Sequence, residues 1–254
     1  MATEVEFFEY YDRAGGKSIR GYLDTNGNPQ ISLNGVPISG GGGNYLGPYT
    51  WANMPPAAAN GGYFAFCTNF GVDGALLYSN GVRWKPSNGS AALKTLETLP
   101  TITGAAALTF AGTPLLIPAG MWQQNDMIEI FASTYKDAGV NTFTNKTRLG
   151  PLGDPTDVAI DAAGFSLTTT GRTMGTTSMR FRRTSATTIK KLGSAGVATG
   201  SNGAVSTTAT PAEVTVANLD SNPLYLSLSA LQSIGSTETE TLLEYSVRYL
   251  SSVN

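Results

Sequence analysis

LLYSNGVRW, residues 76–84, places two apolar runs on either side of an Asn-Gly pair. Asn-Gly is the strongest short-range signal for a two-residue β-hairpin, because both central residues of a type I′ turn have positive φ. Upstream, YFAFCT at 63–68 predicts a partner strand, and GVDG at 71–74 predicts the turn between them. Trp51 and Trp84 supply the aromatic area that such a small sheet needs to bury. A small β module is therefore predicted over residues 47–90.

Glycine is abundant in this chain and charge is sparse. The 254 residues include 30 glycines, and 13% are charged while 41% are hydrophobic. A weakly charged, turn-rich chain that is still apolar enough to fold indicates an all-β protein rather than disorder. The net charge of −2 gives no general attraction to nucleic acid or anionic lipid. We therefore predict neither nucleic-acid binding nor membrane insertion, and the N-terminus, which lacks a secretory signal pattern, predicts folding in a cytoplasm.

The residue inventory restricts the chemistry that is available. The chain has no histidine and a single cysteine, Cys67, which lies in an aromatic run and is predicted to be a buried hydrophobe. Histidine-based catalysis and zinc binding are therefore excluded, and carboxylate chemistry remains. No spacing marks out a catalytic pair among the carboxylates after residue 90, so each is expected to be exposed. We predict no catalytic residue, no metal site and no cofactor. The carboxylates considered are Glu97, Asp126, Glu129, Glu213, Glu238, Glu240 and Glu244.

Two charged clusters could each be a binding site, but each also has a simpler interpretation. Asp154, Asp157 and Asp161 could be calcium ligands, but their spacing does not match a calcium loop, so a solvated turn is predicted. A basic cluster favours a solubilised strand face over nucleic-acid binding, with Arg180 and Arg182 alternating onto the exposed side. This cluster consists of Arg180, Arg182, Arg183, Lys190 and Lys191.

Residues 1–46 form a first region with its own pattern. Asn-Gly at 26–27 and at 34–35 predicts a small β-meander with tight turns. A run of glycines near residue 42 then marks a flexible joint. Four aromatic residues near the start either enter the core of this chain or form a surface that docks on a partner. These four residues are Phe7, Phe8, Tyr10 and Tyr11.

Residues 91–254 carry several strand-like runs with a period of two. The clearest run places Leu243, Tyr245, Val247 and Tyr249 on one face. Strands with one buried face predict an antiparallel two-sheet sandwich. Two aromatic residues in this half, Trp122 and Tyr225, are candidates for stacking on a saccharide ring, with burial in the core as the alternative.

Two motifs in the small β module resemble those of a module found in many tailed-bacteriophage virion proteins. PYTW at 48–51 is similar to the start of that module, and SNGVRW at 79–84 is similar to the hairpin that ends it. In such proteins the module often leads into a C-terminal jelly-roll-like sandwich. Three later stretches are similar to that pattern: LLIPAG at 115–120, NKTR at 145–148 and LLEYSV at 242–247.

The resemblance covers about residues 47–254 and implies a virion structural protein, usually a homotrimer, whose sandwich projects from the particle. The expected function is a non-enzymatic tail or baseplate appendage. In it, residues 1–46 anchor to other virion proteins, residues 47–90 form a neck, and residues 91–254 form a knob that contacts a host glycan or protein. A capsid head fibre or decoration protein that stabilises the shell is the alternative. A carboxylate-dependent polysaccharide depolymerase is the rival from another class.

Overall fold

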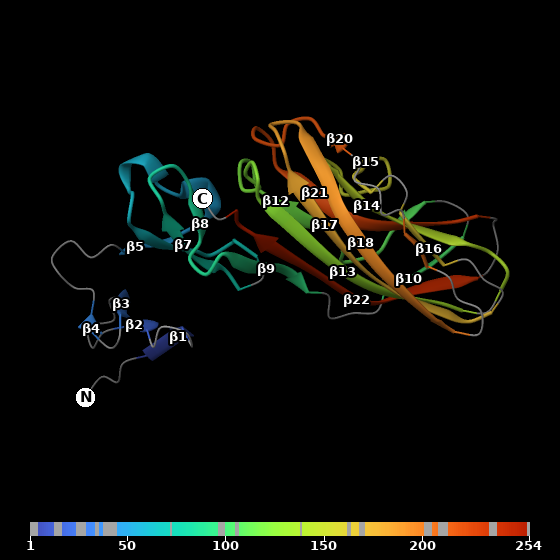
Figure 1. The fold of residues 1–254 in the computed structure, drawn as a ribbon, viewed down its shortest axis with the longest axis horizontal. Coiled ribbons are helices and arrows are strands. Elements are labelled where there is room, and N and C mark those ends of the chain that lie inside the picture. The colour runs from blue at the N-terminus through green and yellow to red at the C-terminus, as the bar shows by residue number, and fades with distance from the viewer. Residues whose placement is uncertain are drawn as a thin grey trace. The chain divides into compact units, whose positions relative to one another are not determined.

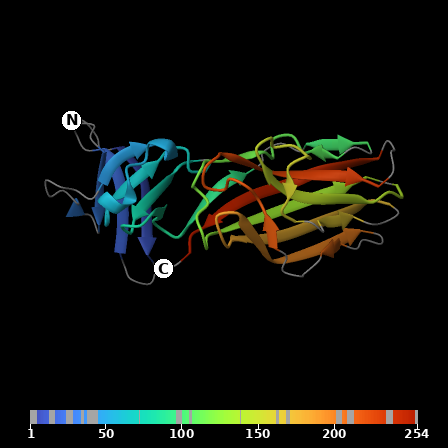
Figure 2. The same ribbon diagram turned by 90° about the horizontal axis from the view of Figure 1, so that it is seen from above.

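We describe the chain from a computed structural model. The structure describes residues 5–12, 17–23, 29–33, 36–37, 45–71, 73–95, 100–104, 107–137, 139–161, 164–167, 171–200, 205–207, 213–233 and 238–252, with side chains from residue 45 onward except in 194–207. Apart from two 3₁₀ helices, every regular element in these ranges is a β-strand, which confirms the all-β prediction (Figures 1 and 2). No helix in the described ranges has the length and apolar character needed to cross a membrane.

The chain divides into two compact units. One comprises the residues up to Asn69 together with Gly74–Ser87, and the other comprises Phe70–Asp73 together with Asn88–Asn254. The predicted division into regions 1–46, 47–90 and 91–254 stays a prediction.

The first sheet of the N-terminal unit is an antiparallel meander, as the sequence predicts. Its four strands pair in chain order: β1 (Val5–Asp12), β2 (Lys17–Leu23), β3 (Pro29–Leu33) and β4 (Val36–Pro37). The side chains of Phe7, Phe8, Tyr10 and Tyr11 lie outside the described part of the structure. The choice between core and docking surface for these aromatics therefore stays open.

The second sheet of this unit is mixed rather than a simple hairpin. β5 (Tyr45–Tyr49) pairs parallel to β6 (Phe64–Cys67), and β7 (Ala75–Ser79) and β8 (Trp84–Pro86) follow antiparallel. The parallel pair needs a crossover, which contains the 3₁₀ helices η1 (Trp51–Asn53) and η2 (Ala57–Ala59). Trp84 is buried as expected, and its indole N–H donates to the Pro55 carbonyl at 2.7 Å.

The Asn-Gly turn differs from the prediction. Ser79 pairs with Trp84, so the loop has four residues rather than two, and Asn80 does not have the positive φ of a type I′ turn. The physical reason is the Asn80 side chain, whose Oδ1 accepts from the backbone N–H groups of Val82 at 3.0 Å and Arg83 at 2.9 Å. Such side-chain bonds favour a wider turn over the two-residue form.

Two sheets form the second unit. The first contains β9 (Ser90–Thr95), β10 (Thr101–Thr103), β22 (Thr239–Leu250), β13 (Met127–Lys136), β17 (Thr173–Arg183), β18 (Thr188–Gly200) and β20 (Glu213–Thr215). The second contains β11 (Leu108–Thr109), β12 (Leu115–Ile117), β21 (Leu224–Gln232), β14 (Phe143–Gly150), β15 (Val158–Ala159), β16 (Phe165–Leu167) and β19 (Val205–Thr207).

The strand order of these sheets is that of a jelly roll. The first sheet runs β9 and β10, β22, β13, β17, and the second runs β11 and β12, β21, β14, β16. With β9 counted together with β10, and β11 together with β12, successive strands up to β17 alternate between the sheets, except that β14, β15 and β16 share one. β18 extends the first sheet beyond β17, and the last two strands, β21 and β22, take the central places. Two Greek keys arranged in this way make a double-sheet sandwich. The predicted jelly-roll-like sandwich is confirmed.

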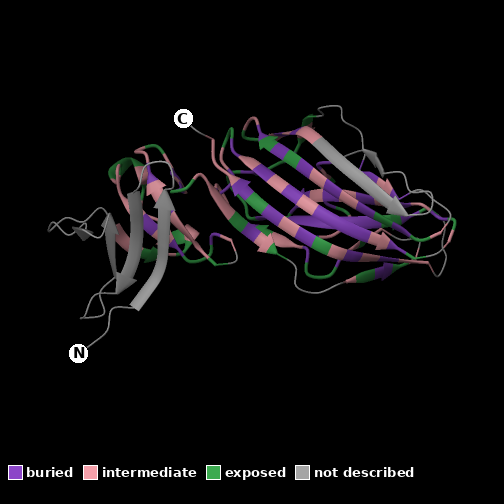
Figure 3. Cartoon of the chain, turned by 60° about the horizontal axis from the view of Figure 1, so that its bottom comes forward, coloured by how far each residue is buried: buried purple, intermediate pink, exposed green. Residues whose placement is uncertain are grey.

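Buried and exposed residues alternate along the central strands (Figure 3). The inward face of β13 carries Ile128, Ile130 and Ala132, and that of β17 carries Met179 and Phe181, as the period of two predicts. Tyr245, Val247 and Tyr249 of β22 are also buried. Alternation thus identifies most of the core of this unit.

A β-bulge in β22 changes the alternation near its start. Ser133 pairs with Glu244, but the next residue, Thr134, pairs with Leu242, so Leu243 is the extra residue. An extra residue reverses which side chains face inward on one side of the bulge. Leu242 and Glu240 are therefore buried, and Leu243, predicted to share the core face, is only half-buried.

Candidate functional site

Trp122 is part of the core and not a stacking platform. Its side chain is 1% exposed, and its indole N–H donates to the Asp126 carbonyl at 3.1 Å. A sugar ring needs an exposed aromatic face, which Trp122 does not present. The saccharide-stacking prediction for Trp122 is therefore wrong, and the alternative weighed with it, burial in the core, is what the structure shows.

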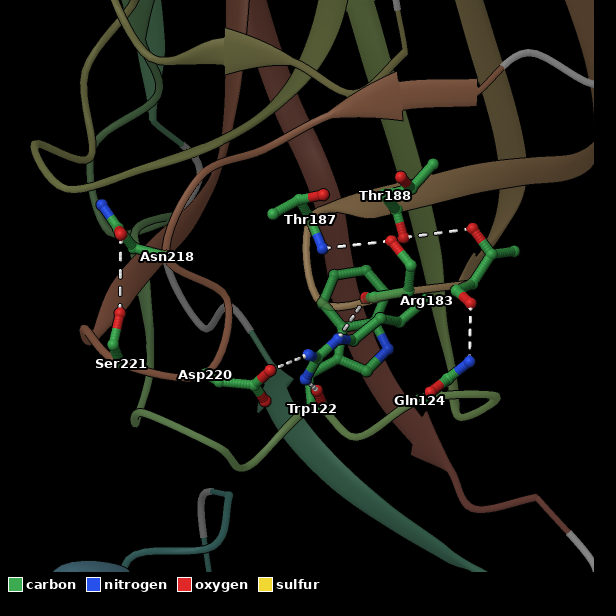
Figure 4. A network of polar contacts seen from close by, with 10 residues as sticks. Trp122, Gln124, Arg183, Thr187, Thr188, Asn218, Asp220 and Ser221 are labelled. Atoms are coloured by element: carbon green, nitrogen blue, oxygen red, sulfur yellow. Dashed lines mark hydrogen bonds and ion pairs between the residues drawn. The ribbon is translucent and has the colours of Figure 1, made fainter.

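Arg183, at the end of β17, is the centre of a polar network beside Trp122 (Figure 4). Its buried guanidinium donates to the Trp122 carbonyl, to the Asp220 carboxylate and, through Nε at 2.8 Å, to the Ser185 carbonyl. Three turns of the jelly roll, at 121–126, 184–188 and 218–222, are thereby connected through one side chain. The fork geometry of arginine permits several such bonds at once.

Further hydrogen bonds reinforce the same turns. Gln124 Nε2 donates to the Thr184 carbonyl at 2.9 Å, and Thr184 Oγ1 donates to the Thr188 carbonyl at 3.2 Å (Figure 4). The bond to the Arg183 guanidinium, together with its charge, lowers the pKa of the Asp220 carboxyl. The network therefore holds loops in place, and all of its polar contacts named above are within the protein.

Tyr225 lies on the outer face of β21 in an exposed apolar patch. It is 36% exposed, and Leu116 of β12, its cross-strand partner, is 47% exposed. Leu152 and Val158, from the segment that follows β14, are exposed as well. Tyr225 and Leu116 define the Tyr225 patch. It is the only sequence-predicted knob site that the structure leaves accessible to a partner within the described residues.

Asp157 fixes the loop that carries Leu152. Its carboxylate accepts from the backbone N–H groups of Leu152 at 3.2 Å and Gly153 at 2.6 Å. Arg148 reaches the same loop from β14, because its Nη1 donates to the Asp157 carbonyl oxygen at 2.8 Å. This loop lies against Tyr225, because a Cβ added at Gly153 would be 3.2 Å from the Tyr225 Cβ.

The prediction of a solvated turn for the three aspartates holds only for Asp154, whose side chain bonds to Thr156 within an exposed turn. Asp157 and Asp161 are buried. Asp161 pairs with the buried ammonium of Lys191 at 2.6 Å, so the two residues belong to the interior. In the described part of the chain, no three acidic or cysteine side chains gather in a way that could hold a metal ion.

The basic cluster likewise contains both exposed and buried residues. Arg180 and Arg182 are exposed as predicted, and Arg180 pairs with Glu129 at 2.7 Å. Arg183 and Lys191, by contrast, are buried with acidic partners. Only the position of Arg183 on the inward side of the Met179 and Phe181 alternation could have indicated its burial from the sequence.

Two of the carboxylates expected to be exposed are buried. Asp126 accepts from the Tyr249 hydroxyl and, at 2.8 Å, from the Ser252 backbone N–H. Glu240 is 0% exposed, because the bulge in β22 turns it inward. The Glu240 Oε1 accepts from Asn145 Nδ2 at 2.8 Å, which joins the two sheets across the core.

No protein-family model and no curated protein matches the chain. Among solved structures, the sandwich is distantly similar to peanut lectin with a 9-mer peptide, PVIWSSATG, at 10% identity and a TM-score of 0.32, over 65% of this chain and 99% of that chain. A likeness of this degree assigns no ligand to the protein.

Proposed function

We propose that this chain is a non-enzymatic structural protein of a tailed-phage virion. In this proposal it is a trimeric, fibre-like appendage of the tail or baseplate, anchored by residues 1–46 and displaying its jelly roll. Jelly rolls occur in viral capsid domains, although lectins and cupins share the architecture. The fold supports the proposal only by analogy, so the contacts of specific residues are the stronger support.

The main support for the proposal is that buried charged side chains form hydrogen bonds and ion pairs that hold loops together. Arg183 holds three turns, Asp157 holds the 150–154 loop, and Asp161 pairs with Lys191. Each of these charged groups forms its hydrogen bonds or ion pair with other parts of the protein, and these contacts hold the loops in place. A displayed knob requires such loops, because a pre-organised surface loses less entropy when it binds.

Purified phage particles provide the test of where on the virion the protein is located. Antibodies raised against the jelly-roll unit should label purified particles, and quantitative mass spectrometry of those particles should give the copy number. A handful of trimers indicates the tail, whereas dozens or more indicate the head fibre or decoration alternative. Absence of the chain from purified particles would refute both.

The anchor assignment has its own test. Deletion of residues 2–13 should leave a soluble protein that no longer enters particles. Val82→Ser serves as the control, because Val82 is 82% exposed in the turn between β7 and β8 of the same unit and its loss should leave incorporation unchanged. Normal incorporation of the deleted chain would remove the anchor role.

The Tyr225 patch is the surface that we assign to the host. Tyr225→Ser should weaken binding of the full chain to host cells, because it removes the aromatic centre of an exposed apolar patch. Leu231→Ser is the matched control, since Leu231 is 44% exposed on the same outward side of β21 but lies six positions along the strand. Equal loss of binding in both variants would contradict the assignment.

A further inference from the structure

One end of the jelly-roll interior is polar rather than apolar. The inward positions there belong to β13, β14, β17, β21 and β22, and they carry amides, hydroxyls and charges. The buried polar residues at this end are Thr134, Lys136, Asn145, Thr173, Thr177, Gln232, Glu240 and, through its hydroxyl, Tyr245. Polar groups in a sandwich core are costly unless each finds a partner.

Glu240 is the least compensated of these groups. Its Oε1 accepts from Asn145, but its Oε2 is buried without a hydrogen-bond partner. Burial raises the pKa of this carboxyl to about 7, although the Asn145 bond, the nearby Thr134 hydroxyl and the charge of Lys136 all act in the opposite direction. An ionised carboxylate in this position is therefore short of positive charge.

Lys136 supplies part of that charge, but its ammonium is shared with the neighbouring loop. Its ammonium donates to the Gly139 carbonyl at 3.1 Å and lies 3.7 Å from Glu238 Oε2. Glu238 in turn accepts from the Val140 backbone N–H at 2.9 Å. Lys136 therefore shares its single positive charge between Glu238 and Glu240.

Several oxygen atoms near Glu240 are also without hydrogen-bond partners. They include Asn145 Oδ1 and Thr134 Oγ1, the latter close enough to influence the carboxyl but outside hydrogen-bonding geometry. Thr177 Oγ1 and the Tyr245 hydroxyl are orphaned as well, and both flank Ala132 in the adjoining row of the sheet. Gly175 is the cross-strand partner of Thr134.

We propose that Glu240, Asn145 and Thr134 bind a monovalent metal cation, sodium or potassium, inside the jelly roll. The unpartnered atoms are all oxygens, which are the ligands that hard cations prefer. One positive charge balances the single buried carboxylate of Glu240, whereas a divalent ion would leave a net positive charge in the interior. Water completes the shell, and water alone would satisfy the hydrogen bonds of these oxygens without balancing the charge of the carboxylate.

The test compares melting temperatures of the full chain in sodium, potassium and choline chloride at equal ionic strength and about pH 8, where Glu240 is ionised. A cation at about ten times its Kd should raise the melting temperature by roughly 3–6 °C over choline. Equal melting temperatures in the three salts would overturn the proposal.

Single substitutions test whether the difference in melting temperature between the salts arises at Glu240 and Thr134. Glu240→Gln should abolish the difference between the salts, and Thr134→Val, which keeps the shape of the side chain, should reduce it. Glu244→Gln is the matched control, because Glu244 is an exposed carboxylate on the same strand. A salt difference that survives in Glu240→Gln, or that Glu244→Gln removes, would refute the assignment. If Glu240→Gln does not fold, Thr134→Val decides, and an unchanged salt difference in it would refute the site.

Discussion

The guanidinium of Arg183 contacts two carbonyl groups and one carboxylate that come from three different turns. No other side chain of similar reach could replace it. Lysine has a single charged nitrogen without the planar fork, and an apolar residue would leave the Trp122 carbonyl and Asp220 without their donor.

Arg183→Lys is expected to lower the free energy of unfolding of the jelly-roll unit by about 1–3 kcal/mol, because bonds to the turns are lost while the charge stays buried. Urea unfolding followed by tryptophan fluorescence measures this change. Arg182→Lys is the control: its side chain is exposed on the opposite face, and its effect should stay within about 0.5 kcal/mol. Similar losses in both variants would contradict the role of Arg183.

The Asp220 carboxyl makes the network sensitive to acid. Its pKa is lowered in the folded protein by the Arg183 bond and charge, so the stabilisation is complete above the ordinary pKa of an aspartate and is lost as pH falls through the lowered value. Wild type should therefore be more stable than Asp220→Asn at about pH 6, and the two should converge towards about pH 2. If the difference in unfolding free energy between wild type and Asp220→Asn does not change with pH, titration of Asp220 is not responsible for the acid sensitivity.

At the scale of elements, sequence pattern predicted the strands well and their irregularities poorly. The alternation in β17 and β22 follows from side chains that must face the core or the solvent. The bulge at Leu243 carries no such signal, because Leu242 and Leu243 are both apolar and either could face inward. The burial of Glu240, and with it the proposed cation site, was therefore beyond prediction from the sequence. Likewise, Trp122 lies in a turn between β12 and β13, where no strand alternation indicates whether its side chain faces the core or the solvent.

The β13–β14 loop provides a prediction at this scale. Gly139 has a φ of +146°, and a Cβ there would lie 1.9 Å from the Glu238 carboxyl. Gly139→Ala should therefore cost about 3 kcal/mol, since it adds displacement of Glu238 to backbone strain. Gly104→Ala is the matched control, because Gly104 has a φ of +106° with nothing within 4 Å, and strain alone should cost about 1 kcal/mol. Equal losses in thermal melts would mean that the Glu238 contact adds nothing.

For the whole molecule, the two compact units should unfold as separate transitions. Cys67, the single cysteine, is 0% exposed in the N-terminal unit, so its thiol reports the opening of that unit alone. We expect the urea dependence of Cys67 labelling to be unchanged in Arg183→Lys, while the transition of the jelly roll moves to lower urea. A matching shift of the labelling curve would indicate one cooperative molecule.

The central place of β22 has a consequence for synthesis on the ribosome. β22 pairs with β9 and β10 on one side and with β13 on the other, so it completes a sheet whose other strands all precede it in the chain. Until residues 239–250 leave the exit tunnel, the nascent chain holds an unpaired strand edge on β13, and such edges promote aggregation. The jelly roll thus cannot close until this strand has been synthesised, and a ribosome that stalls before it releases a product that cannot form the sheet.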